Sequence, residues 1–92
     1  LFLSATICRL RAPEEECLPS RVRNLSADGM MADFTQLAEV GEPVAVTVRG
    51  IGTVAGHVAW IRRGRIGVKF DVEVDPLMAR KPVGRQVQPP IK

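Results

Sequence analysis

Apolar and polar residues alternate with a period of two through most of this chain, and the alternation limits the folds that it can adopt. Residues 44–48 place a valine at every second position, residues 66–70 place Ile, Val and Phe in the same way, and Val54, Val58 and Trp60 are spaced to share one face. Such alternation is typical of antiparallel strands that bury one face. No stretch before residue 75 shows the period of a helix, so the sequence predicts an all-β fold.

Turn-forming residues divide this pattern into short strands. Glycine and proline cluster at residues 41–43 and 49–52, and Arg63-Gly64 joins two strong strands as a tight hairpin. We expect strands at residues 2–10, 19–25, 29–34, 43–49, 53–62 and 65–71. Six short strands with short connections predict a small six-stranded antiparallel β-barrel, closed or split.

Two segments interrupt the strand pattern. Residues 11–19 hold two prolines and three consecutive glutamates, which is typical of a loop between the first two strands. Near the end of the chain, Asp75 is suited to cap a short helical turn that begins at Pro76 and ends before Pro82. We therefore predict a barrel domain at residues 1–76, followed by a helical turn and an extended or disordered tail at residues 77–92.

Length and composition favour one soluble domain. Ninety-two residues can bury a modest core, and a chain that is 46% hydrophobic and 25% charged is typical of globular proteins. No apolar run approaches the roughly 20 residues of a membrane-spanning helix, and the apolar residues 1–8 lack the features of a signal peptide. We expect a cytoplasmic protein in which Cys8 and Cys17 are reduced thiols, since two cysteines are few for a secreted disulfide scaffold.

The charge of the chain favours an anionic partner. The net charge is +3, and arginines gather at residues 9–11, 21–23 and 62–65. Most of these side chains are expected to be solvated, and the last group lies in the hairpin, distant from the turn at residues 24–29. Single-stranded nucleic acid is a poor candidate partner, because such sites rely on aromatic stacking and only 4% of the residues are aromatic.

The sequence offers little for catalysis or metal binding. Its single histidine, His57, falls in the middle of an expected strand, and neither cysteine is spaced with it as a metal site requires. Glu14, Glu15 and Glu16 lie in a loop that would not fix the distance between two carboxylates. No phosphate-binding loop and no nucleophile elbow is present. We therefore expect a binding protein rather than an enzyme, with no cofactor and no metal.

One turn concentrates polar groups that can hold a ligand. The stretch RVRNLSADGMM places Asn24, Ser26 and Gly29 between two expected strands. An amide, a hydroxyl and a bare backbone on one small patch can bind a ligand, or they can simply form the turn. Arg21 and Arg23 flank the patch, where they are either outward strand residues or extra positive charge for an anion.

The pattern N-x-S-x-x-G at residues 24–29 resembles the second sequence signature of PilZ domains, the bacterial receptors for cyclic di-GMP. In those domains an apolar strand, a G-x-x-V-x-V strand, a strand ending near a Trp and a hairpin into G-V-x-F follow in order. The matching segments here are Met30 to Phe34, Gly41 to Val48, Val54 to Trp60 and Gly67 to Phe70. The resemblance covers residues from about 2 to 76. It implies a six-stranded barrel that binds cyclic di-GMP and passes the signal to a protein partner or an adjoining domain.

The other PilZ signature, an R-x-x-x-R stretch before the first strand, is not present in this chain. Its expected position falls immediately before Leu1. If arginines stand there, the resemblance implies a ligand clamped between this arm and the barrel, with Asn24 bonded to a guanine or phosphate, Ser26 donating a hydrogen bond, and Gly29 at positive φ. Trp60 is expected to close one end of the core, and the alternative is that it offers a ring edge to a base. Without the arginines, we expect a degenerate barrel that binds proteins in motility, pilus or polysaccharide regulation.

Overall fold

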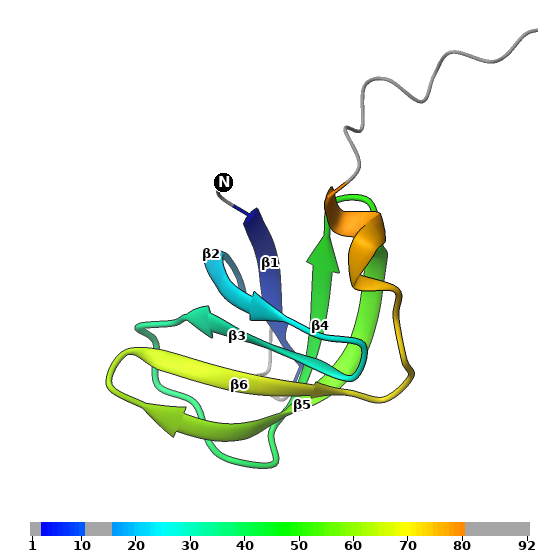
Figure 1. Ribbon diagram of the computed structural model, residues 1–92. Coiled ribbons are helices and arrows are strands. Elements are labelled where there is room, and N and C mark those ends of the chain that lie inside the picture. The colour runs from blue at the N-terminus through cyan, green and yellow to red at the C-terminus, as the bar shows by residue number, and fades with distance from the viewer. Residues whose placement is uncertain (1–2, 11–15, 81–92) are drawn as a thin grey trace, which may run out of the picture.

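A six-stranded antiparallel sheet closes on itself to form a barrel (Figure 1). The structure is a computed structural model and describes residues 3–10 and 16–80. Its elements are β1 (Leu3–Arg9), β2 (Glu16–Leu25), β3 (Gly29–Asp33), β4 (Pro43–Val48), β5 (Gly52–Arg62), β6 (Arg65–Phe70) and the short 3-10 helix η1 (Pro76–Arg80). The strands follow the order β1-β2-β3-β6-β5-β4 around the barrel, and the pairing of β1 with β4 closes it.

The predicted all-β barrel is confirmed, and each of the six expected strands is present. The helical turn forms as η1, and the Asp75 carboxylate accepts a hydrogen bond from the Leu77 backbone N–H at 3.0 Å. The largest difference is in β2, which begins at Glu16 rather than at residue 19, so the loop before it is shorter than predicted. Outside the described residues lie Arg11, Glu14, Glu15, Pro82 and the predicted tail.

Every second residue of most strands points into the barrel, where valine dominates. Val44, Val46 and Val48 of β4 are buried, and so are Ile7 of β1 and Val58 of β5. Burying an aliphatic side chain of this size contributes about 1.5–3 kcal/mol relative to leaving it exposed. Because its own side chains fill the interior, the barrel offers a ligand its outer surface rather than its centre.

A β-bulge in β2 turns Asn24 outward. Val22 pairs with Ala32 of β3, but Asn24 pairs with the neighbouring Met31, so Arg23 is an extra residue in the ladder. Strict alternation would have placed Asn24 on the buried face together with Val22. The bulge therefore exposes the Asn24 side chain.

A second β-bulge, in β5, corrects the sequence prediction for Trp60. The register shifts between Val58 and Trp60, which leaves Ala59 as the extra residue. Val54 and Val58 face the core, but Trp60 is partly exposed and pairs with Gly67 of β6. The prediction that Trp60 shares a face with the two valines and closes the core was wrong, because one inserted residue moves every later side chain of the strand to the other face.

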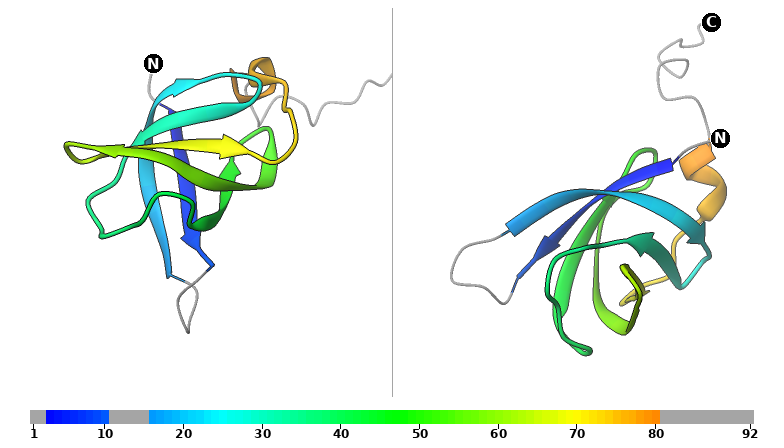
Figure 2. Two further views of the ribbon diagram at one scale, coloured as in Figure 1. Left: turned by 90° about the horizontal axis from the view of Figure 1, so that it is seen from below. Right: turned by 90° about the vertical axis from the view of Figure 1, so that its left-hand side faces the viewer.

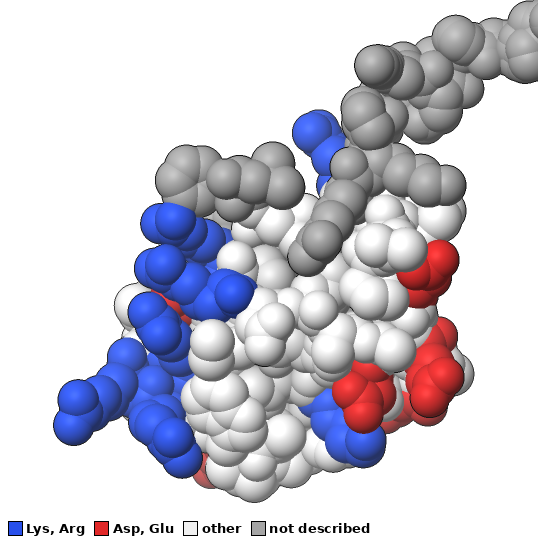
Figure 3. Space-filling model, viewed as in Figure 1, with Lys and Arg blue, Asp and Glu red and all other residues white. Residues whose placement is uncertain are grey.

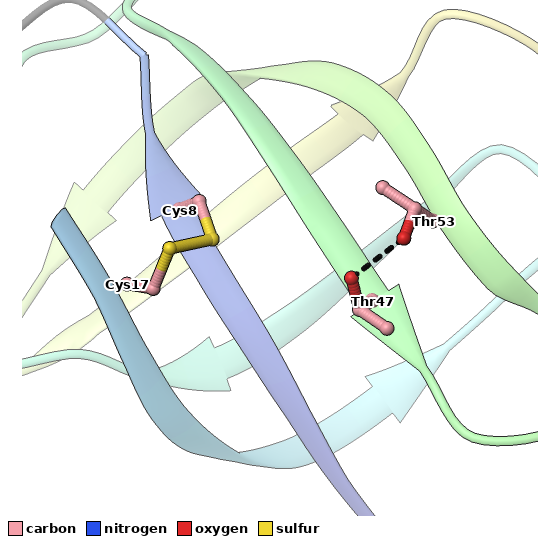
Figure 4. The surroundings of a disulfide bond; sticks show 4 residues. All are labelled: Cys8, Cys17, Thr47 and Thr53. Carbon is pink, nitrogen blue, oxygen red and sulfur yellow. Dashed lines mark hydrogen bonds between the residues drawn. A yellow bond between two sulfur atoms is a disulfide. The ribbon is translucent and has the colours of Figure 1, made fainter. Parts of the chain in front are cut away.

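Cys8 of β1 and Cys17 of β2 form a disulfide (Figure 4), so the prediction of two reduced thiols was wrong. The two residues are direct cross-strand partners, with their Cα atoms 3.9 Å apart. The prediction placed Cys17 in a loop, whereas the early start of β2 brings it into register with Cys8. On the neighbouring strands β4 and β5, the hydroxyls of Thr47 and Thr53 share a hydrogen bond of 2.8 Å. Both pairs link adjacent strands of the closed sheet.

A buried ion pair joins the end of β1 to the loop before β4. The Glu42 side chain is buried, and its carboxylate accepts hydrogen bonds from Arg9 Nε at 2.5 Å and Arg9 Nη2 at 3.2 Å. The Glu39 backbone N–H donates a third bond at 3.0 Å. The hydrogen bond to Glu42 raises the pKa of Arg9 above its ordinary value. A carboxylate this deeply buried depends on such partners, so the pair fixes the loop against β1.

The short helix packs at one end of the barrel. In Figures 1 and 2, η1 lies near the start of β1, and the end of β1 lies at the opposite end of the barrel. At Gly50, in the β4–β5 turn, an added Cβ atom would collide with the backbone of Met78 in η1. Gly50 also has a φ of 89°, so two separate constraints require glycine there. Among the described residues, no helix has the length and apolar character needed to cross a membrane.

Removing the cation of the buried ion pair should destabilise the barrel. In Arg9→Ala the Glu42 carboxylate loses two charge-assisted hydrogen bonds, so we expect the free energy of unfolding to fall by about 3 kcal/mol. Urea denaturation measures this loss. The control is Arg49→Ala, at an exposed arginine in the β4–β5 turn, which should change the free energy by no more than about 0.5 kcal/mol. A loss below about 1 kcal/mol in Arg9→Ala would show that Glu42 does not depend on Arg9.

Candidate functional site

The residues that the two bulges turn outward fall in one row across four strands. The row crosses β2, β3, β6 and β5 through the pairs Asn24–Met31, Met31–Gly67 and Gly67–Trp60. A surface pocket of about 280 Å³ lies over this row. The described residues that line the pocket also include Ser26, Asp28, Gly29 and Lys69. The fold therefore gathers Asn24, Ser26 and Gly29, three of the predicted site residues, at one pocket.

Hydrogen bonds hold the turn between β2 and β3 in place. The Ser26 backbone N–H donates to the Gly29 carbonyl oxygen at 2.9 Å. The Ser26 hydroxyl lies 3.0 Å from the Asp28 carboxylate and 3.2 Å from the Gly29 carbonyl oxygen, and both are acceptors. The Phe70 backbone N–H donates to the Asp28 carbonyl oxygen at 2.8 Å and ties the turn to β6. Because a hydroxyl has one proton and two lone pairs, Ser26 can serve the turn and still accept a hydrogen bond from a ligand.

Gly29 is required for a different reason than the sequence suggested. It is not among the glycines of the described chain with positive φ, so the predicted backbone conformation was wrong. Gly29 pairs with Lys69 across β3 and β6, and a Cβ atom on it would come 2.5 Å from the Val68 carbonyl oxygen. The close approach of the two strands therefore requires glycine. It also leaves this part of the pocket without a side chain.

Trp60 forms one wall of the pocket. Its indole covers Gly67, where a Cβ atom would overlap the ring. The guanidinium carbon of Arg62 lies over the ring, 5.6 Å from the centroid, which is a cation–π distance. Arg62 is thus next to the pocket, although the sequence had suggested that the hairpin arginines lie far from it. A partly exposed indole can offer a flat contact to a nucleotide base.

Arg21 and Arg23, the other two predicted site residues, do not line the pocket, and both are exposed on β2. Arg23 forms a bidentate ion pair with Asp33 of β3, with Nε–Oδ1 and Nη2–Oδ2 distances of 2.9 and 2.8 Å. Hydrogen bonding from Arg23, aided by the charges of Arg23 and Arg65, lowers the pKa of Asp33. The pair therefore contributes to stability above the ordinary pKa of an aspartate, and the contribution is lost as the pH falls through the lowered pKa.

Sequence reasoning missed Met31, Gly67 and Lys69 as pocket residues. These residues could have been found only from the cross-strand register, which brings β3, β6 and β5 together once the strand order is known. His57 lies away from the pocket lining, and its Nδ1 is 3.8 Å from the Asp71 carboxylate. Within the described residues, no group of three or more His, Cys, Asp or Glu side chains is arranged to hold a metal ion.

Comparison with known proteins identifies the relatives of this chain at the level of a family. A family model described as PilZ domain matches residues 3–85. No match was found among curated proteins or among solved structures. The matched range includes the whole barrel and every residue that lines the pocket.

Adding a methyl group at Gly67 should expel the Trp60 indole from its place in the pocket wall. Since Trp60 is the single tryptophan and the chain has no tyrosine, intrinsic fluorescence reports its surroundings directly. For Gly67→Ala we expect red-shifted emission and stronger quenching by acrylamide. The control is Gly64→Asn in the hairpin, where an added Cβ atom meets nothing within 4 Å and asparagine tolerates the φ of 78°. Unchanged emission and quenching in Gly67→Ala would contradict the packing of Trp60 on Gly67.

Proposed function

The chain belongs to the PilZ domain family, and we propose that it is the cyclic di-GMP-binding signalling module of a bacterial protein. PilZ domains are binding and receptor modules rather than enzymes. The observation that carries the proposal is the arrangement of Asn24, Ser26 and Gly29, which line one pocket together with the exposed face of Trp60. A polar rim beside an aromatic wall suits a ligand with flat bases and charged phosphates.

Each pocket residue has a proposed role that follows from its chemistry. The Asn24 amide, which carries both donors and an acceptor, bonds a guanine edge or a phosphate. The Ser26 hydroxyl bonds the ligand or supports the turn, and the bare backbone at Gly29 lets the ligand approach closely. The Trp60 ring packs against a base. Arg21 and Arg23, outside the pocket lining, add positive charge beside the site.

In this proposal, arginines that precede Leu1 complete the site. Leu3, at the start of β1, pairs with Val22 of β2, two residues before Asn24. β1 therefore begins beside the part of β2 that carries the pocket. An arm attached at this point would be well placed to bring guanidinium groups to phosphates or to guanine edges, which planar forks recognise better than ammonium groups do.

A second candidate function is a degenerate barrel that binds no nucleotide and works through contacts with proteins in motility, pilus or polysaccharide regulation. The observation that favours it is that Arg23, beside the polar turn, is already held by the Asp33 carboxylate through two hydrogen bonds. For both candidates we propose a cytoplasmic site of action, the compartment of an intracellular nucleotide signal. The Cys8–Cys17 disulfide is uncommon in that compartment, so ligand binding should be measured in both the oxidised and the reduced protein.

Calorimetric titration of the natural protein with cyclic di-GMP tests the proposal. If arginines precede Leu1, we expect a dissociation constant on the order of micromolar, and much weaker binding by residues 1–92 alone. Ser26→Ala should weaken binding roughly tenfold, because one hydrogen bond to a charged ligand contributes about 1.5 kcal/mol. Ser4→Ala, at an exposed serine of β1 outside the pocket, is the matched control and should leave the affinity unchanged.

Three results would change the proposal. Absence of binding by the natural protein, with arginines present before Leu1, would favour the degenerate barrel. Equal loss of affinity in Ser26→Ala and Ser4→Ala would place the nucleotide outside the pocket. Tight binding by residues 1–92 alone would contradict the role of the arm but keep the pocket.

A further inference from the structure

A row of arginines runs along the barrel beside the pocket. Next to the pocket row, on the side of the β5–β6 hairpin, lies a parallel row of cross-strand pairs. Asp33 of β3 pairs with Arg65 of β6, and Arg65 pairs with Arg62 of β5. We define the arginine row as Arg21 and Arg23 of β2, Arg65 of β6, Arg62 of β5 and Arg63 of the hairpin turn. In Figure 3, Lys and Arg gather along the left-hand edge of the face that β3, β6 and β5 present, and Asp and Glu along its right-hand edge. The two charges are thus separated across the surface.

This arrangement is unfavourable for the isolated barrel. Arg62 and Arg65 face each other directly across β5 and β6, and like charges in this position destabilise a sheet. Within the described residues, the Asp33 carboxylate lies in the row, and Arg23 and Arg65 share it. Where a sequence breaks a local rule of stability, a binding function is the usual reason.

Asp33 also shows which group the row is shaped to hold. Arg23 grips its carboxylate through two parallel hydrogen bonds, and Arg65 Nε lies 3.4 Å from the same oxygen that Arg23 Nε contacts. The guanidinium fork matches a carboxylate in this bidentate way, which an ammonium group cannot do. Arg62 and Arg63 are exposed, and they can offer the same fork to a carboxylate of a partner.

The spacing of the row fits an extended chain. Neighbouring strands lie about 5 Å apart, so the row from β2 to β5 spans about 15 Å. In an extended segment, alternate side chains point the same way at intervals of about 7 Å, so three alternate acidic residues cover a similar length. An acidic segment crossing the strands can therefore place successive carboxylates along the row.

We propose that the arginine row is a docking surface for an extended, acidic segment of a protein partner. The proposal does not depend on nucleotide binding in the pocket. Single-stranded nucleic acid fits less well, because such sites interleave cations with several aromatic rings, whereas Trp60 is the aromatic group next to the row. Partners with clustered Glu or Asp would also be steered to this edge by the separation of charge across the surface.

A fluorescein-labelled peptide of alternating Glu and Thr is the probe, and fluorescence anisotropy is the measurement. Arg62→Gln combined with Arg63→Asn should weaken binding roughly fivefold or more, since each exposed ion pair contributes up to about 1 kcal/mol. Asparagine is chosen because Arg63 has a φ of 49°, which asparagine tolerates. The control, Arg49→Gln, removes an exposed arginine in the β4–β5 turn, away from the row, and should change affinity by about twofold or less.

Asp33 offers a test in the opposite direction. Asp33→Asn frees the guanidinium groups of Arg23 and Arg65 from their internal carboxylate, so we expect the acidic peptide to bind roughly threefold tighter. Glu73→Gln, at an exposed residue between β6 and η1, removes the same charge away from the row and should have a smaller effect. An equal gain in both variants would reduce the proposal to diffuse attraction and overturn it.

Other probes define the remaining outcomes. Tighter binding of a polythymidine oligonucleotide of equal charge, lost in the Arg62/Arg63 variant, would assign the row to nucleic acid instead. Binding to vesicles of phosphatidylcholine with phosphatidylserine but not to the peptide would assign it to a membrane surface. No measurable binding of the peptide even at low ionic strength would also overturn the proposal.

Discussion

Two inserted residues, Arg23 in β2 and Ala59 in β5, determine which side chains the barrel presents on its outer surface. Each bulge reverses the facing of the residues after it, so Asn24 and Trp60 leave the core side and join one exposed row. Without either bulge, a polar amide or a large indole would have to enter an interior that valines already fill. The pocket thus exists because the strand ladders are interrupted at two positions.

Two glycines, Gly29 and Gly67, also shape the pocket. At Gly29 and Gly67 a Cβ atom would meet the Val68 carbonyl oxygen or the Trp60 ring, so both positions stay bare for steric reasons. Gly29 leaves the pocket without a side chain next to the β2–β3 turn, and Gly67 makes room for the Trp60 indole that covers it. A binding site on the outside of a small, filled barrel needs such bare positions, because the sheet itself provides no cavity.

The sequence predicted the barrel well because period-two alternation and turn residues are local signals, and they placed six strands in the correct order along the chain. The sequence did not predict the features that depend on the register between strands. The facing of Trp60 required the bulge at Ala59, and the Cys8–Cys17 disulfide required β2 to begin at Glu16. The polar turn was found by its pattern, but the reason for its glycine was wrong, because the approach of β3 to β6 is a contact between residues far apart in the chain.

The arginine row likewise could not be predicted from local sequence. Its members belong to two groups that are distant in sequence, and only the order β2-β3-β6-β5 places them along one edge. This edge adjoins the pocket through Arg62, which contacts the ring of Trp60. A ligand that moves the Trp60 ring would also move a cation of the row. If both proposals hold, a nucleotide signal has a short physical route from the pocket to the surface proposed to bind a protein.

The proposed ligand lies on the outer row formed by the two bulges. A nuclear magnetic resonance titration of the isotope-labelled natural protein with cyclic di-GMP tests this placement most directly. We expect shifts of the amide signals of Asn24, Ser26, Gly29 and Gly67 and of the Trp60 indole N–H, with little change at Gly50 in the β4–β5 turn. Shifts confined to the β4–β5 turn and η1, with the Trp60 indole signal unmoved, would contradict it.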